Sequence, residues 1–258
     1  MEYQFIRVEH EDRLTIVTLR RPDSHNALNF AAHEELQHAF DNFAQDDQQW
    51  IAILTGSGGK AFCAGHDLKQ QANDANLTTP NKGFGGLVTR FDLNKPVIAA
   101  VNGVAVGGGF ELALACDIIV ASSNATFALP EVKVGLAALA GGMQRLPSLI
   151  GLKRSMGMLL TGRRVTAEEG VQLGFVNEVT NGDVLTLARK WAADILQCSP
   201  LSVRATKEAV MRGLGVPVAQ AMTEQWKYPQ VQAMLSSQDA IEGPKAFAEK
   251  RLPNWVGY

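Results

Sequence analysis

Two glutamates, Glu111 and Glu131, stand in apolar stretches where a charged carboxylate is unfavourable to bury. Glu111 follows three consecutive glycines in NGVAVGGGFELALACD, and Glu131 follows a strand-like run and a proline in ATFALPEVKVGL. Two carboxyl groups presented from the ends of two strands are suited to general acid–base chemistry, because partial burial sets their pKa values. A structural carboxylate at the start of a helix is the alternative for Glu111.

The three glycines at 107–109 predict a ligand site at the start of a helix. A strand is expected to end at Asn102 and Gly103, followed by a glycine turn and a helix from near Phe110. The first N–H groups of a helix are unpaired and carry positive dipole charge, so Gly108 N–H is a candidate oxyanion donor. Tight strand–helix packing is the alternative. Neither the dinucleotide spacing GxGxxG nor a phosphate-loop Lys-Ser/Thr is present.

A second loop, GGKAFCAGHDLK at 58–69, follows the strand-like run 50–56. Its small residues allow close approach of the backbone, so His66 N–H could be a second donor facing Gly108 N–H. Cys63 as a nucleophile and His66 as a base or metal ligand are weaker interpretations, because no partner stands at a suitable spacing. His33 and His38 are five apart and do not share a helical face, so no metal site is predicted.

The two loops and the segment around Glu131 resemble those of the enoyl-CoA hydratase/isomerase, or crotonase, superfamily. The resemblance is carried by FCAGHDLK, KPVIAAVNGVAVGGGFELALACD and FALPEVKVGLAALAGGMQRLP, with RPDSHNALN, LTGRRVTAEEGVQLGFVNEV and EGPKAFAEKR matching in order. It implies an α/β fold, a spiral of ββα repeats with a C-terminal helical trimerisation region. It also implies a homotrimer or a homohexamer.

The resemblance implies an acyl-CoA substrate whose thioester oxygen is held by the N–H groups of His66 and Gly108. Family hydratases use two glutamates, which match Glu111 and Glu131, whereas isomerases commonly keep only the match to Glu131. The expected reaction is the reversible addition of water across the C2=C3 bond of a 2-enoyl-CoA. GGFELALA and LTGRR resemble the carnitinyl-CoA dehydratase branch, so that activity and delta isomerisation are the alternatives. No metal or redox cofactor is expected, because coenzyme A is part of the substrate.

The resemblance also implies contacts with CoA. The expected residues are Asp23, Ser24, His25, Ala64, Gly65, Asp67, Leu68 and Lys69 from one chain, and Phe247 and Lys250 reaching the CoA of a neighbouring subunit. Asp23 departs from the basic residue that is common at its position. An ordinary solvated surface lysine is the alternative for Lys250.

Short apolar strands must position these residues. FIRV and RLTIVTL predict a hairpin, and the runs at 50–56, 95–103 and 116–122 predict buried strands. Thr166 and Glu169 predict a helix-capping box. Beyond residue 183 the pattern is helical only, with a helix predicted to start at Ser199-Pro200. We therefore expect a core at 1–196 and a helical oligomerisation region at 197–258, and the resemblance implies that the core carries the CoA and acyl site.

Composition limits the remaining classes of function. The 258 residues are 46% hydrophobic and 19% charged, which suits a large buried core, and the net charge is −2. The absence of a basic stretch and the presence of both glutamates count against an RNA-binding family member and against a CoA-binding scaffold without turnover. The three scattered cysteines and the absence of a signal-like start predict a cytoplasmic protein. The apolar run 97–121 is interrupted by Asn102, glycines, Glu111 and Asp117, so no membrane span is expected.

Overall fold

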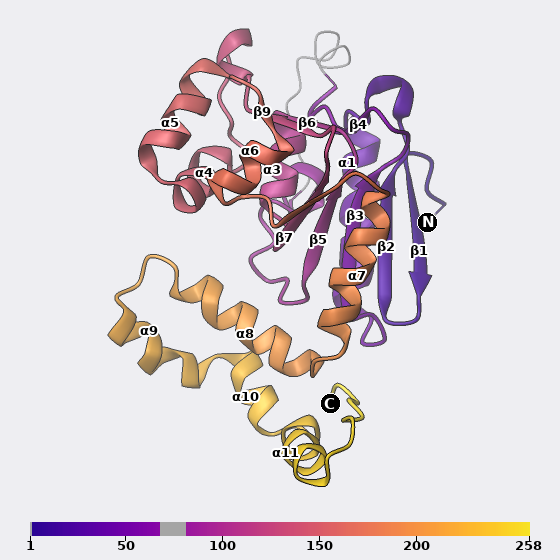
Figure 1. The fold of residues 1–258 in the computed structure, drawn as a ribbon, viewed down its shortest axis with the longest axis vertical. Coiled ribbons are helices and arrows are strands. Elements are labelled where there is room, and N and C mark those ends of the chain that lie inside the picture. The colour runs from indigo at the N-terminus through magenta and orange to yellow at the C-terminus, as the bar shows by residue number, and fades with distance from the viewer. Residues whose placement is uncertain (1, 68–80) are drawn as a thin grey trace.

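The computed structural model describes residues 2–67 and 81–258, and its centre is a six-stranded sheet (Figure 1). In order across the sheet, the strands are β1 (Ile6–Glu11), β2 (Leu14–Leu19), β3 (Ile51–Gly56), β5 (Val97–Val101), β7 (Ile118–Ser122) and β10 (Glu178–Thr180). β1 and β2 form the predicted antiparallel hairpin, and each later pair is parallel. The predicted buried strands are confirmed as β3, β5 and β7.

A smaller second sheet lies beside the first. Its strands are β4 (Ala61–Cys63), β6 (Val104–Val106), β8 (Thr126–Ala128) and β9 (Val165–Thr166), in that order. β3, β5 and β7 each lead into one strand of this sheet, and β6 leads on into helix α3 (Gly108–Leu114). The recurring strand–strand–helix unit is the predicted α/β architecture.

The local prediction around the glycines is corrected in one respect. β5 ends at Val101, and β6 stands between it and the helix, where a direct glycine turn was expected. A three-residue strand is too short to show alternation in the sequence, and β6 is held by pairing with β4 and β8. The extra strand carries the chain from the large sheet to the small one before α3 begins.

Both faces of the large sheet are buried, which is why its parallel strands are continuously apolar. Successive residues of β3 point to opposite faces: Leu54 packs with α1 (Phe30–Gln45), and Ile53 packs with α7 (Val184–Leu196). Leu36, Phe40 and Phe43 form the buried face of α1, as their helical spacing predicts.

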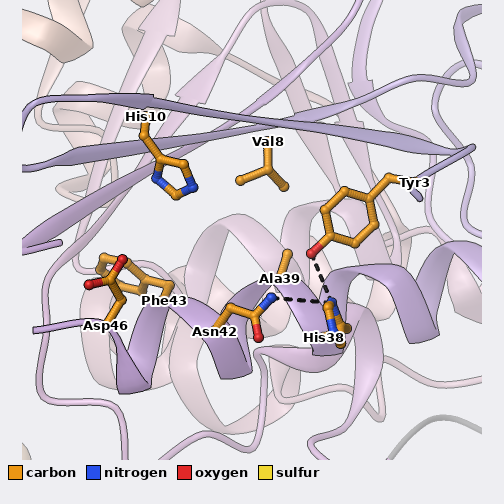
Figure 2. A pocket seen from close by; sticks show the side chains of 8 residues that line it. All are labelled: Tyr3, Val8, His10, His38, Ala39, Asn42, Phe43 and Asp46. Atoms are coloured by element: carbon orange, nitrogen blue, oxygen red, sulfur yellow. Dashed lines mark hydrogen bonds between the residues drawn. The ribbon is translucent and has the colours of Figure 1, made fainter. Parts of the chain in front are cut away.

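α1 is joined to the N-terminal segment by a buried carboxylate. Glu35 accepts hydrogen bonds from the backbone N–H groups of Gln4, Phe5 and Ile6, at 2.8–3.1 Å. Farther along the same layer, a cavity of about 280 Å³ lies between β1 and α1 (Figure 2). There the Tyr3 hydroxyl and His38 Nδ1 are hydrogen-bonded at 2.9 Å.

Shorter helices connect the sheets. They are the 3-10 turns η1 (Pro22–Ser24), η2 (Phe84–Gly86) and η3 (Glu131–Val134), and the helices α4 (Gly142–Ile150), α5 (Leu152–Thr161) and α6 (Ala167–Leu173). Half of the predicted capping box is present on α6. Thr166 Oγ1 accepts from Glu169 N–H at 3.2 Å, whereas the Glu169 carboxylate pairs with Arg163 at 2.7 Å.

The C-terminal helices extend away from the sheets (Figure 1). They are α8 (Pro200–Gly213), α9 (Val218–Glu224), the 3-10 turn η4 (Gln225–Lys227), α10 (Pro229–Leu235) and α11 (Asp239–Glu249). Ser199 caps α8 with Pro200 at its first position, as predicted. No helix in the described ranges is both long and apolar enough to cross a bilayer.

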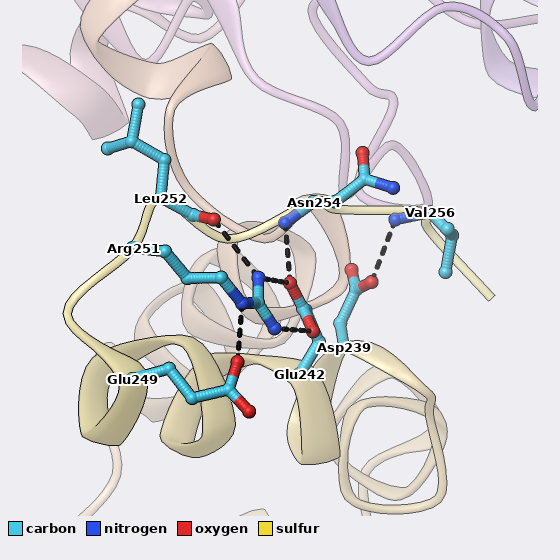
Figure 3. Close-up of polar contacts among 7 residues, drawn as sticks. All are labelled: Asp239, Glu242, Glu249, Arg251, Leu252, Asn254 and Val256. Carbon is cyan, nitrogen blue, oxygen red and sulfur yellow. Dashed lines mark hydrogen bonds and ion pairs between the residues drawn. The ribbon is translucent and has the colours of Figure 1, made fainter.

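The residues after α11 fold back onto it (Figure 3). Arg251 pairs with Glu242 and Glu249, and buried Asp239 accepts from the Ser199 hydroxyl and from Val256 N–H. The tail is thereby attached to the starts of both α8 and α11.

We predict that Glu35→Ala lowers the free energy of unfolding by about 3 kcal/mol, because three backbone donors lose a charged acceptor. Denaturant titration at pH 7 measures the loss. Glu34→Ala is the matched control, since Glu34 is the exposed neighbour on the same helix, and its change should stay within about 0.5 kcal/mol. Equal stability of the two variants would contradict the role of Glu35.

Candidate active site

Each of the three glycines before Glu111 is required by a different close approach. Gly107 has φ +57°, and a Cβ there would lie 3.2 Å from Glu131 Oε1. A Cβ on Gly108 would lie 2.5 Å from the Phe84 ring, and one on Gly109 would overlap the carbonyl oxygen of Cys63. A side chain at Gly108 or Gly109 would push α3 away from its surroundings, and one at Gly107 would be strained by the positive φ.

Gly65 brings the second loop against the same helix start. It has φ +88°, and a Cβ there would lie only 3.0 Å from Val106 O and 3.1 Å from Gly108 N. The loop containing His66 therefore lies against the first N–H of α3, as the sequence predicted.

The N–H groups of His66 and Gly108 are both unengaged. Leu28 N–H donates to Gly65 O and Leu28 O accepts from Asp67 N–H, so the intervening N–H of His66 points away from Leu28. Within residues 2–67 and 81–258, no hydrogen bond occupies His66 N–H or Gly108 N–H. Two neighbouring free donors of this kind can stabilise negative charge on a ligand oxygen.

A cavity of about 760 Å³ opens beside these donors. Most of its wall is apolar, from residues such as Phe84, Val88, Phe91, Val106, Pro130, Val134, Leu136, Ala137, Leu139 and Ala140. Among the described residues, the polar side chains on the wall are those of His66, Thr89, Glu131, Lys133, Gln144 and Arg145. Such a wall suits a mostly apolar ligand with polar chemistry at a few points.

Glu131 lines this cavity at the start of η3, directly after β8 and Pro130. Its Oε2 is buried and has no hydrogen-bond partner among the described residues. Burial raises the pKa of Glu131, and a hydrogen bond with its own backbone opposes the shift only in part. The site therefore favours the protonated carboxylic acid.

Glu111 lies behind the residues that line the cavity. It is 3% exposed and is not among the lining residues, but its Oε1 accepts from Gly142 N–H at 2.9 Å. Burial raises its pKa to about 7, the Gly142 N–H lowers it, and the charge of Glu131 raises it further. Glu111 can thus exchange a proton near neutral pH, at the rear of the cavity wall.

The expected CoA contacts on the two N-terminal loops are placed together. Asp23 and Ser24 belong to η1, and the carbonyl of His25 accepts from Ala64 N–H at 3.0 Å. Ala64 and Gly65 line the cavity, and Asp67 pairs with Arg21 at 2.9 Å. Leu68 and Lys69 lie outside the described residues.

The remaining two expected contacts are separate from this cluster. Phe247 and Lys250 are on α11 or at its end, and α11 lies at the opposite end of the molecule from β4 and β6 (Figure 1). Phe247 is 87% exposed. Within one chain they do not reach the cavity, and their contact with CoA in a neighbouring subunit stays a prediction.

Several parts of the site were not found from the sequence. Phe84, Gly142, Arg145 and His33 support it, and Arg145 Nη2 donates to Val88 O at 2.7 Å. Met143 is not a lining residue, whereas its neighbours Gln144 and Arg145 are. Only GGMQR, as part of the family motif, could have directed attention to Arg145.

The described residues give no support to the alternatives of a Cys63 nucleophile and of a metal site. Cys63 is fully buried, and burial raises the pKa of its thiol to about 12, which disfavours the reactive thiolate. In the described ranges, no group of three or more His, Cys, Asp or Glu side chains is arranged to hold a metal ion.

Known proteins are similar to this chain along nearly its whole length. The family model for enoyl-CoA hydratase/isomerase matches residues 9–258. A carnitinyl-CoA dehydratase of Salmonella arizonae is 43% identical over 260 aligned residues, covering 98% of each chain. Another, from Citrobacter koseri, is 45% identical, covering 93% of this chain and 94% of that relative.

Solved structures of enoyl-CoA hydratases are similar to this chain over the same length. An enoyl-CoA hydratase from Mycobacterium tuberculosis has a TM-score of 0.91 at 40% identity, covering 98% of this chain and 99% of that chain. One from Mycobacterium marinum has a TM-score of 0.92 at 41% identity, with the same coverage.

The burial of Glu111 predicts a pH-dependent loss of stability. Its pKa is raised from 4.5 to about 7, so the folded state favours the protonated form, and stability falls as the pH rises through that window. Glu111→Gln removes the charge, so its free energy of unfolding relative to that of wild type should be about 2.5 kcal/mol higher at pH 8 than at pH 5. Denaturant titration at both pH values measures the difference.

Glu168→Gln is the control for this experiment, because Glu168 is exposed on α6. Its effect should be the same at both pH values. If Glu111→Gln were equally pH-independent, the buried carboxyl would have an ordinary pKa.

Proposed function

The chain belongs to the enoyl-CoA hydratase/isomerase family, and on that premise we propose that it adds water reversibly across the C2=C3 bond of a 2-enoyl-CoA thioester. The observation that carries the proposal is the meeting of Glu131 with two unengaged N–H groups at one cavity, together with the buried Glu111, whose pKa is also raised and is coupled to the charge of Glu131. Its relatives and structural neighbours are named as hydratases or dehydratases of acyl-CoA, which are hydro-lyases.

The two N–H groups would stabilise the negative charge that develops in this reaction. Attack of water at C3 moves electron density onto the thioester oxygen, which becomes enolate-like. His66 N–H and Gly108 N–H would hold that oxygen, and each such donor contributes about 3 kcal/mol of transition-state stabilisation. Because Gly65 permits the two backbones to approach closely, the donors need no rearrangement to act together.

The two carboxyl groups divide the proton transfers. Glu111, ionised, would orient the water and accept its proton as oxygen bonds to C3. Glu131, protonated, would deliver a proton to C2. The absence of a donor to Glu131 Oε2 in the described chain favours this protonated form, while the Gly142 N–H helps Glu111 to ionise. The reverse reaction uses the same groups in opposite protonation states.

The proposal requires no metal or redox cofactor, since coenzyme A enters with the substrate. Its binding is assigned to the loops at Asp23, Ser24, His25, Ala64, Gly65 and Asp67, together with Leu68 and Lys69. Phe247 and Lys250 would contribute from a neighbouring subunit. Large exposed apolar side chains on the C-terminal helices, such as Val218, Trp226 and Ile241, support a homotrimer or homohexamer built on residues 197–258. The three free cysteines support a cytoplasmic location.

Carnitinyl-CoA dehydratase activity is the second candidate. The curated relatives at 43–45% identity carry that name, and the reaction uses the same proton transfers on a quaternary ammonium substrate. A panel of crotonyl-, octenoyl-, feruloyl- and crotonobetainyl-CoA, followed by loss of the conjugated thioester absorbance, distinguishes the substrates.

We expect Glu131→Gln and Glu111→Gln each to lower kcat for crotonyl-CoA hydration by about 10²- to 10⁴-fold, because each removes one proton transfer. Loss of absorbance under saturating substrate measures kcat. Binding of butyryl-CoA, which cannot react, should be retained in both variants when measured by calorimetry.

The relative sizes of the two effects identify the reaction type. A delta isomerase would survive Glu111→Gln far better than Glu131→Gln. Wild-type protein that hydrates no enoyl-CoA of the panel, with Glu131→Gln unchanged toward every acyl-CoA, would overturn the proposal. Glu168→Gln serves as the control of matched chemistry outside the cavity.

A further inference from the structure

His66 contributes a side chain as well as a backbone N–H to the cavity. The residue is half-buried and lines the cavity wall. In the part of the chain that the structure describes, neither of its ring nitrogens has a hydrogen-bond partner, and neither is among the enclosed, unpartnered polar atoms. Both nitrogens therefore remain accessible to a ligand.

The His66 ring is held in place by a second histidine. The two rings of His33 and His66 are stacked, with centroids 5.7 Å apart and planes 22° apart. His33 is completely buried on α1, its Nδ1 accepts from Gly85 N–H at 2.9 Å, and the Phe84 ring stands edge-on to it at 4.5 Å. These contacts fix His33, which in turn limits the orientations open to His66.

Both imidazoles are neutral near pH 7. Because Nδ1 of His33 is an acceptor, its proton is on Nε2, and burial lowers the pKa of His33 to about 3. Burial also lowers the pKa of His66, while the neighbouring Asp67, paired with Arg21, raises it in part. A neutral His66 offers a ligand one donor and one acceptor.

The position of this imidazole is set by its own backbone. If His66 N–H holds the thioester oxygen, the ring of the same residue, which lines the cavity, lies within a side chain's reach of the thioester. The wall around it is largely apolar, including Phe84, Val106 and Ala137. An alkyl chain packed there would desolvate the imidazole without satisfying it, which is unfavourable.

We propose that the His66 side chain, held by His33, is a specificity-determining group that selects 2-enoyl thioesters carrying a hydroxyl or similar hydrogen-bonding substituent within a few carbons of the thioester. This proposal rests on the proposed function. The proposed function uses only the backbone N–H of His66, to hold the thioester oxygen. The further proposal gives the side chain of the same residue a role in choosing the substrate.

The test uses pairs of substrates that differ only by hydroxyl in place of methyl. They are 4-hydroxybut-2-enoyl-CoA against pent-2-enoyl-CoA, and 5-hydroxypent-2-enoyl-CoA against hex-2-enoyl-CoA. We expect wild type to favour the hydroxylated member of at least one pair by about tenfold or more in kcat/KM. His66→Phe should reduce that preference to within threefold, and His66→Gln, which keeps a donor and an acceptor, should retain more of it.

His10→Phe is the matched control, because it makes the same chemical change at an exposed histidine outside this cavity, and it should keep the wild-type ratio. Equal use of both members of both pairs by wild type would overturn the proposal, as would a preference that persists in His66→Phe. These outcomes are distinct from failure of the proposed function, in which wild type would hydrate none of the four substrates.

Discussion

The arrangement of the site depends on how closely α3 approaches the end of β4. A Cβ on Gly109 would overlap the carbonyl oxygen of Cys63, and a Cβ on Gly65 would crowd Gly108 N. Only glycine at these positions lets the start of the helix lie against the His66 loop. This one contact brings two backbone donors together, directs Glu111 inward on the first turn of α3, and leaves Gly107 beside Glu131. The cost of these three arrangements is the conformational entropy that the glycines lose on folding.

The two sheets explain why the residues of the candidate site can come from distant parts of the sequence. β3, β5 and β7 of the large sheet each lead into a short strand of the small one, and the ends of β4, β6 and β8 bring His66, Gly108 and Glu131 to one place. The small sheet contributes few residues to the core. Its parallel register nevertheless aligns three chain segments so that their following loops meet.

The fold class, the long strands and the main helices were predictable because their periodicity is local, as with Leu36, Phe40 and Phe43. The family resemblance is confirmed, and the structure brings Glu131, Gly108 and His66 together as that resemblance implied, with Glu111 directly behind.

The supporting contacts were not predictable. Gly142 reaches Glu111 across 31 residues and His33 reaches Gly85 across 52, and no sequence spacing encodes such pairs. Strand β6 was missed because its three residues carry too little pattern, whereas β8 lies in the strand-like run predicted before Pro130.

The folded-back tail has a consequence for the order of events during synthesis. Asp239 binds Ser199, which precedes it by 40 residues, and Val256, which follows it by 17. The contact between the tail and α11 can therefore form only after residue 256 has been synthesised. The sheets, whose last strand ends at Thr180, can form earlier. The C-terminal helices would thus reach their final arrangement only after the sheets have had time to form.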